Sequence, residues 1–172
     1  MARMTKAAAA TLLVHVALLF AFSLADDSAS ILPRPQSLSS FNPNNTQLQN
    51  RGTCSYTVSI KTSCSSTKYT RDQISLSFGD AYGNQVYAPG LEDPSSRTFE
   101  RCSTDTFEIT GPCTYQICYL YLYRSGYDGW KPETVKVYGY RVKAVSFYYN
   151  EFIPNGVWYG FNLCNGRLAA ST

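Results

Sequence analysis

The stretch Gln73–Asp80, QISLSFGD, decides the fold class of this 172-residue chain. Ile74, Leu76 and Phe78 alternate with serines along it. Because successive side chains of a β-strand point to opposite faces, this alternation predicts a strand with one face in an apolar core. The Gly, Asp and Asn residues that follow predict a tight turn.

The same alternation recurs outward from this stretch through residues 54–164. Further apolar residues share one face in small groups: Tyr56, Val58 and Ile60; Phe107 and Ile109; Val135 and Val137; Tyr159 and Phe161. No window repeats its apolar residues with the period of a helix. Seven or eight such strands with turns between them indicate an all-β fold, an antiparallel β-sandwich formed by one domain.

The first 25 residues have the pattern of a secretory signal peptide. Arg3 and Lys6 precede an apolar run, and Ser23–Ala25 offers the small residues that a signal peptidase recognises. The alternative, a membrane anchor, needs about 20 apolar residues, and this run is shorter. We therefore expect cleavage after Ala25 and a secreted protein, either extracellular in the apoplast or within the secretory pathway.

The segments that flank the expected domain are polar. Residues 26–53 are rich in Ser, Asn, Gln and Pro and contain few large apolar residues, so we expect them to be disordered. Within them, Asn44 begins an Asn-Asn-Thr glycosylation sequon, which is either modified or unused. Residues 165–172 form a short C-terminal tail that we expect to fray.

Charge and histidine content exclude several classes of function. Loss of residues 1–25 leaves 15 − 2 = 13 basic and 12 acidic side chains, a net charge of about +1, which argues against nucleic acid as a partner. The single histidine, His15, lies in the predicted signal peptide, so His-dependent nucleophilic catalysis and ordinary zinc sites are excluded. The carboxylates are scattered with no evident acid–base pair, and we predict that the protein is not an enzyme.

Six cysteines remain after the predicted cleavage, and an even number in a secreted domain predicts three disulfides. They are Cys54, Cys64, Cys102, Cys113, Cys118 and Cys164. Metal binding would favour closely spaced CxxC pairs, which this sequence lacks.

Four motifs in order resemble the plant embryo-specific protein 3 family, which is related to the PLAT/LH2 domain. They are CSYTVSIKTSC (54–64), DQISLSFGDAYGN (72–84), FERCSTDTFEITGPC (99–113) and DGWKPETVKVYG (128–139). The resemblance covers residues 54–164 and implies an eight-stranded sandwich of two four-stranded sheets. It also implies a module that attaches to membranes or partner proteins, without a defined activity.

Two features of PLAT domains have counterparts here. Trp130 occupies a position where such domains commonly carry a Trp, which either inserts into a membrane or packs at a strand start; we favour packing. Calcium-binding relatives use loop oxygens, which Asp72, Asp80 and Asn84 would supply. Arg71 stands where relatives often have an acid, and its charge opposes a divalent ion, so we favour ordinary turn residues.

The stretch ICYLYLYR, 117–124, places tyrosines on one strand face and leucines on the other. PLAT relatives tend to be aliphatic at Leu120 and Leu122, so we place these in the core and the tyrosines outward. If the strand with Val135 and Val137 lies alongside, the outer face becomes a candidate contact surface consisting of Tyr119, Tyr121, Tyr123, Lys136 and Tyr138. The alternatives are simple cross-strand pairing of the tyrosines, or an N-terminal segment folded over them.

Sequence alone leaves 15 disulfide pairings open. Because the ends of a sandwich can meet, we favour Cys54–Cys164, with Cys113–Cys118 closing a short loop and Cys64–Cys102 remaining. The function that we favour is a secreted, non-enzymatic module that binds a membrane lipid surface or a protein partner through the tyrosine face. The alternative is an apoplastic structural protein that binds cell-wall polysaccharide.

Overall fold

A computed structural model describes residues 33–43, 52–93, 95 and 97–165 of the chain. The predicted signal peptide 1–25, the sequon at Asn44 and residues 166–172 of the tail lie outside the described residues. Within the described part, all regular structure is β. The strands are β1 (Gln36–Leu38), β2 (Thr53–Thr62), β3 (Gln73–Gly79), β4 (Gln85–Ala88), β5 (Thr104–Pro112), β6 (Tyr119–Ser125), β7 (Pro132–Gly139), β8 (Val142–Tyr148) and β9 (Trp158–Asn162).

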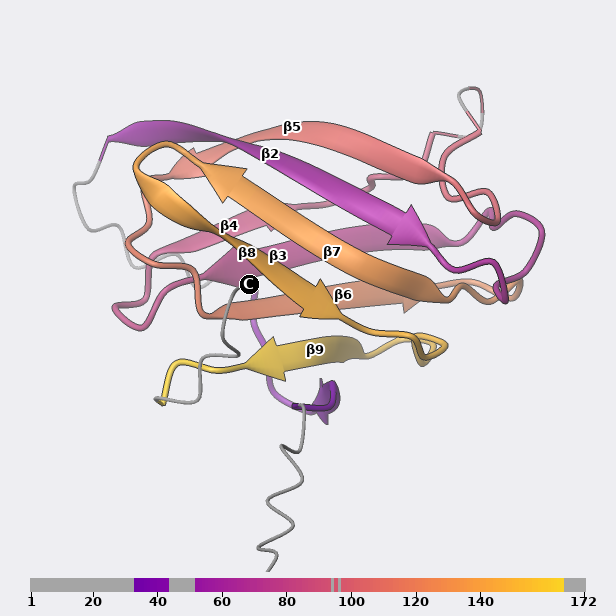
Figure 1. Ribbon diagram of the computed structural model, residues 1–172. Helices are drawn as coiled ribbons and strands as arrows, with labels where there is room; N and C mark the ends of the chain where they lie inside the picture. The colour runs from indigo at the N-terminus through magenta and orange to yellow at the C-terminus, as the bar shows by residue number, and fades with distance from the viewer. Residues whose placement is uncertain (1–32, 44–51, 94, 96, 166–172) are drawn as a thin grey trace, which may run out of the picture. The chain divides into compact units, whose positions relative to one another are not determined.

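The strands form two antiparallel sheets, which confirms the predicted sandwich (Figure 1). One sheet has the order β1-β9-β6-β3-β4 and the other has the order β5-β2-β7-β8. Successive strands lie in different sheets after β1, β2, β4, β5, β6 and β8, whereas β3–β4 and β7–β8 each stay within one sheet. The described strands number nine rather than eight, because β1 extends the first sheet at the edge of β9.

The core lies between the two sheets and follows the alternation in the sequence. Ile74, Leu76 and Phe78 of β3 are fully buried, as predicted. They pack with inward residues of the opposite sheet, including Tyr56, Val58, Ile60, Val135 and Val137. The Tyr56 and Phe78 rings contact edge to face, with centroids 5.1 Å apart.

Residues 33–43 correct the expectation that the whole of 26–53 is disordered. Leu38 pairs with Trp158 and Gln36 with Gly160 across β1 and β9. Farther along the segment, the Gln85 side-chain amide donates a hydrogen bond to the Pro43 carbonyl at 2.6 Å. A polar composition predicts disorder, but one aromatic residue of the segment, Phe41, packs on Tyr121 and Trp158 and orders it.

All six cysteines form disulfides, but two of the three predicted pairings are wrong. The bridges are Cys54–Cys113, Cys64–Cys102 and Cys118–Cys164. Strand order explains the difference. Cys54 lies on β2 opposite the end of β5, where Cys113 follows, and Cys118 precedes β6 beside the end of β9, where Cys164 follows. Each of these two bridges therefore links the ends of neighbouring strands.

Candidate functional site

The tyrosine row of β6 faces away from the core, as the alternation predicts. Leu120 and Leu122 are fully buried between the sheets, which confirms their place in the core. The expectation that the row is open to solvent is wrong, because Tyr121 is only 4% exposed. Burial raises the pKa of the Tyr121 phenol, and a hydrogen bond with Asn162 offsets part of this effect.

Phe41 covers the row. Its ring centroid lies 5.0 Å from that of Tyr121, 5.0 Å from that of Trp158 and 6.5 Å from that of Tyr119. Tyr123 also packs on Trp158, with 5.4 Å between the centroids. Residues 33–43 and the outer face of this sheet thus form a second, smaller apolar layer. The tyrosine row is a packing surface within it.

Lys136 and Tyr138 do not join the tyrosine row. They lie on β7, which pairs with β2 and β8 in the other sheet. Their side chains therefore point to the opposite side of the sandwich from Tyr121. The predicted common surface is wrong because it rested on β6 and β7 being neighbours, and consecutive strands of a sandwich often lie in different sheets.

Trp130 is a packing residue, which is the interpretation that the sequence favoured. It is fully buried, so the alternative of a binding residue that inserts into a membrane is wrong. Its Nε1 donates a hydrogen bond to Thr62 Oγ1 at 3.1 Å, and its ring centroid lies 4.9 Å from that of Phe99. A buried indole with a satisfied N–H stabilises the start of β7 rather than reaching a membrane.

The three residues considered as calcium ligands do not come together. Asp72 precedes β3 and Asp80 follows it, so they lie roughly 25 Å apart along the strand. Asp80 and Asn84 do meet, with 2.7 Å between Asp80 Oδ2 and Asn84 Nδ2, and they shape the turn into β4. In the described part of the chain, no group of three or more His, Cys, Asp or Glu side chains is placed to hold a metal ion.

One end of the sandwich presents aromatic side chains that the sequence interpretation did not single out. Antiparallel pairing brings four loops to this end, and we call it the aromatic loop end because three of them carry exposed aromatic side chains. Tyr127 is fully exposed, whereas Tyr69 and Phe152 are about half exposed. The three loops with these rings are 63–72 between β2 and β3, 126–131 between β6 and β7, and 149–157 between β8 and β9, and the fourth loop is 89–103 between β4 and β5.

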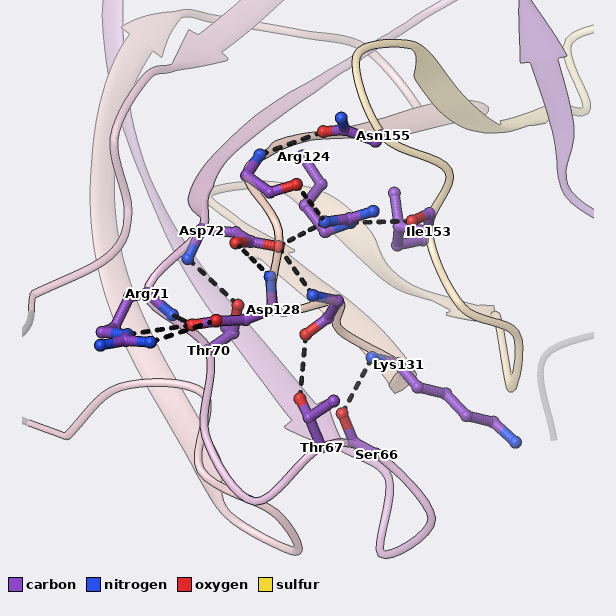
Figure 2. A network of polar contacts seen from close by, with 12 residues as sticks. Ser66, Thr67, Thr70, Arg71, Asp72, Arg124, Asp128, Lys131, Ile153 and Asn155 are labelled. Carbon is purple, nitrogen blue, oxygen red and sulfur yellow. Dashed lines mark hydrogen bonds and ion pairs between the residues drawn. The ribbon is translucent and has the colours of Figure 1, made fainter.

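A buried ion pair, Asp72–Arg124, ties the three loops together (Figure 2). Asp72 is 3% exposed and comes from the first loop, and Arg124 from the end of β6. The Asp72 carboxylate also accepts the backbone N–H groups of Asp128 and Gly129, each at 2.9 Å. Arg124 Nε donates to the Ile153 carbonyl at 2.9 Å, so the pair reaches all three loops.

The hydrogen bonds decide the charge state of Asp72. Burial alone would raise its pKa, but the bonds from Asp128 N–H, the Arg124 side chain and Gly129 N–H outweigh burial and lower it. Outside this centre, the Arg71 guanidinium binds the Asp128 carboxylate with 3.1 Å between Nε and Oδ2 and lowers the pKa of that carboxyl. Both carboxylates are therefore ionised at neutral pH.

Further polar contacts between the loops complete the scaffold (Figure 2). Thr67 Oγ1 donates to the Gly129 carbonyl at 2.9 Å, and Ser66 Oγ accepts the Lys131 N–H at 3.0 Å. Gly126 has a φ of 152° and its Cα faces the Asp72 carboxylate, so a Cβ there would collide with it. The side chain of Lys131 extends away from the network. The backbone of the loop end is thus fixed while its aromatic tips stay exposed.

The sequence does contain a signal for this ion pair. Arg124 follows Leu120 and Leu122 on the inward face of its strand, and Asp72 precedes Ile74 with the same inward alternation. Two charged residues of opposite sign at inward positions require partners, since a buried charge is costly when it is unpaired. The register places Arg124 opposite Ile74, next to Asp72.

Comparison with known proteins identifies relatives. The family model described as embryo-specific protein 3 (ATS3) matches residues 40–164. Embryo-specific protein ATS3A of Arabidopsis thaliana is 60% identical over 149 residues, which cover 86% of this chain and 83% of that protein.

Among solved structures, a LOX crystal structure matches with a TM-score of 0.55 and 19% identity, over 64% of this chain and 17% of that chain. Coral 8R-lipoxygenase, whose structure is titled as showing calcium activation via a C2-like domain, matches with a TM-score of 0.51 and 19% identity, over 62% of this chain and 17% of that chain. This chain thus corresponds to about a sixth of each lipoxygenase, and the likeness shows the PLAT-like fold alone. The chain belongs to the embryo-specific protein 3 family.

Proposed function

We propose that this protein is a secreted, non-enzymatic PLAT-like module that attaches to a membrane lipid surface through the aromatic loop end. The observation that carries the proposal is the exposure of Tyr127 and Phe152, on two loops of the same end, over a backbone that the Asp72–Arg124 pair holds in place. Aromatic side chains with one polar and one apolar end are enriched at membrane interfaces. Three disulfides and no free cysteine among the described residues support an oxidising compartment.

Attachment of this kind is peripheral. The described residues contain no helix that is long and apolar enough to span a bilayer. Insertion of the Tyr127 and Phe152 rings would remove apolar area from water, and full burial of one such side chain is worth about 1.5–3 kcal/mol. Two rings together would therefore contribute on the order of 3 kcal/mol, about a hundredfold in affinity.

Charge should contribute less to attachment through this end than the burial of the two rings does. The four loops together with Arg124 carry six cations and six carboxylates: Lys68, Arg71, Arg97, Arg101, Arg124 and Lys131, and Asp72, Glu92, Asp93, Glu100, Asp128 and Glu151. Their net charge is 6 − 6 = 0, so no strong field attracts anionic lipid. We expect binding that depends on the aromatic rings and depends only weakly on salt or on the proportion of anionic lipid.

Sedimentation with vesicles tests the proposal. The mature, oxidised protein should pellet with phosphatidylcholine vesicles and with vesicles that contain phosphatidylserine, with and without a calcium chelator. The double variant Tyr127→Ala/Phe152→Ala should lose about a hundredfold in affinity. The control Tyr82→Ala/Tyr140→Ala removes two exposed tyrosines from turns at the other end and should bind normally. No pelleting of the wild type, or equal binding by both double variants, would refute the proposal.

A further inference from the structure

The outer face of the sheet β5-β2-β7-β8 differs in chemistry from the covered face of the other sheet. Its inward residues are apolar, so alternation sends hydroxyl side chains outward. Those of β2 and β5 are Ser55, Thr57, Ser59, Thr104, Thr106 and Thr110. None of them is buried, and no described segment lies over them. We call this surface the hydroxyl face.

The strand register arranges the hydroxyl face in transverse rows. In the central row, Lys136 of β7 lies between Ser59 of β2 and Ser146 of β8, and Thr106 of β5 follows Ser59. In the row toward the loop end, Thr134 pairs with Tyr148. In the row on the other side, Tyr138 pairs with Thr57. An ammonium group thus stands among hydroxyls, with a tyrosine in the row on each side.

Both tyrosines are open to a ligand. Tyr138 is 42% exposed and Tyr148 is 64% exposed. They lie four residues apart along the strand direction, about 13 Å. Lys136 Nζ lies 5.1 Å from the centroid of the Tyr138 ring, a distance at which the cation and the ring attract each other. This attraction holds the Lys136 ammonium group close to the Tyr138 ring.

Lys136 has no acidic partner among the described residues. The other lysine of the face, Lys61, is bound to Glu133 with 2.7 Å between Nζ and Oε1. Glu108 keeps its negative charge, but it lies on β5, two strands away from Lys136, and its carboxylate accepts a hydrogen bond from Thr57 at 2.7 Å. The uncompensated charge on the line from Tyr138 to Tyr148 is therefore positive, and it is complementary to an anionic ligand.

The composition of the face favours one class of ligand. Protein interfaces are built around buried aromatic, Met or Arg anchors, whereas short hydroxyl side chains dominate here. A sugar ring has an apolar face that stacks on tyrosine and hydroxyl groups that exchange hydrogen bonds with Ser and Thr. A carboxylate on the sugar would pair with Lys136. A linear chain of such sugars would also span the two tyrosines, which lie about 13 Å apart along the strand direction.

We propose that the hydroxyl face binds an acidic polysaccharide, with Tyr138 and Tyr148 stacking on sugar rings and Lys136 pairing with a carboxylate between them. This site is independent of the aromatic loop end. It also differs from the tyrosine row of β6, which Phe41 covers.

Affinity electrophoresis of the mature, oxidised protein in gels that contain polygalacturonate tests this site. A matched gel contains fully methyl-esterified polygalacturonate, which has the same backbone without the charge. The wild type should be retarded more strongly by the free acid than by the ester, and added salt should weaken the difference. No retardation by the free acid, or equal retardation by both polymers, would overturn the proposal.

Substitutions assign the interaction to the face. Tyr138→Ala and Tyr148→Ala should each weaken binding to both polymers by about tenfold. Lys136→Gln should weaken binding to the free acid by about three- to fivefold and leave binding to the ester unchanged. Tyr140→Ala and Lys143→Gln change exposed residues off the face and should bind as the wild type does. Unchanged thermal unfolding verifies the fold of each variant, and normal binding by the three face variants would overturn the assignment.

Discussion

The strongest test of the loop-end scaffold is the substitution Asp72→Asn. Asparagine keeps the shape of the side chain but only one acceptor oxygen, so one of the two N–H groups of Asp128 and Gly129, which bind different carboxylate oxygens, loses its partner. The change removes the negative charge beside Arg124, which is itself buried. A buried charge left without its partner typically costs 3–5 kcal/mol, and we expect a loss of about that size in the free energy of unfolding.

A double-mutant cycle separates the charge from the packing. Arg124→Met should also destabilise the protein, because it leaves the Asp72 carboxylate buried without a counter-charge. The double variant Asp72→Asn/Arg124→Met removes both charges and should recover most of the loss, since a buried ion pair often contributes little relative to a neutral, well-packed pair. Asp128→Asn is the control, because its partner Arg71 lies on the surface and the exposed pair should contribute far less.

Equilibrium unfolding in urea, followed by tryptophan fluorescence with the disulfides intact, measures these energies. Hydrogen exchange should show faster opening of residues 126–131 and 149–157 in Asp72→Asn, with β2 and β5 unaffected. A loss below about 1 kcal/mol in Asp72→Asn, or a double variant whose loss equals the sum of the two single losses, would refute the role assigned to the ion pair.

Three further predictions concern the cover by Phe41, the Cys54–Cys113 disulfide and the response of stability to acid. Phe41→Ala should lower the free energy of unfolding by about 2 kcal/mol, roughly half the loss expected for a fully buried Phe. It should also increase the quenching of Trp158 fluorescence by acrylamide, and unchanged quenching would contradict the covering role of Phe41. Cys54→Ser/Cys113→Ser opens a loop of 59 residues and should cost about 4 kcal/mol in the chain-entropy model, which thermal unfolding measures. The folded pKa of Asp72 lies below its ordinary value of 3.8, so its contribution is complete above that pH and is lost as the pH falls below it. The difference in unfolding free energy between wild type and Asp72→Asn should therefore be constant near neutral pH and shrink below about pH 4, and a constant difference down to pH 2 would contradict the assignment.

The inward face of each strand could be predicted from the sequence because alternation is a local property. Ile74, Leu76 and Phe78, and then Leu120 and Leu122, occupy the core as their spacing indicates. The assignment needs no knowledge of which strands are neighbours. The assignment of the inward residues is therefore correct even though the predicted strand order is wrong.

The neighbours of each strand could not be predicted in this way. Tyr138 was placed beside Tyr121 because their strands follow each other in the chain, yet β6 and β7 belong to different sheets. The same uncertainty led to the wrong partners for Cys54 and Cys118. Cover by Phe41 depends on a contact between residues 80 positions apart, 121 − 41 = 80; the sequence offers it only as an alternative, because the polar composition around Phe41 does not favour it over exposure of the tyrosines.

The Asp72–Arg124 pair bears on how the loop end would work. In a loop site that depends on a metal, acidic side chains repel one another until a cation binds, so the loops are ordered only when the ion is present. Here the Arg124 guanidinium is a cation that the chain itself supplies, and it reaches Asp72, the Gly126 carbonyl and the Ile153 carbonyl. The positions of Tyr127 and Phe152 are then fixed by folding and not by an ion. Attachment through these rings should therefore be constitutive, and a chelator should leave it unchanged while Asp72→Asn weakens it.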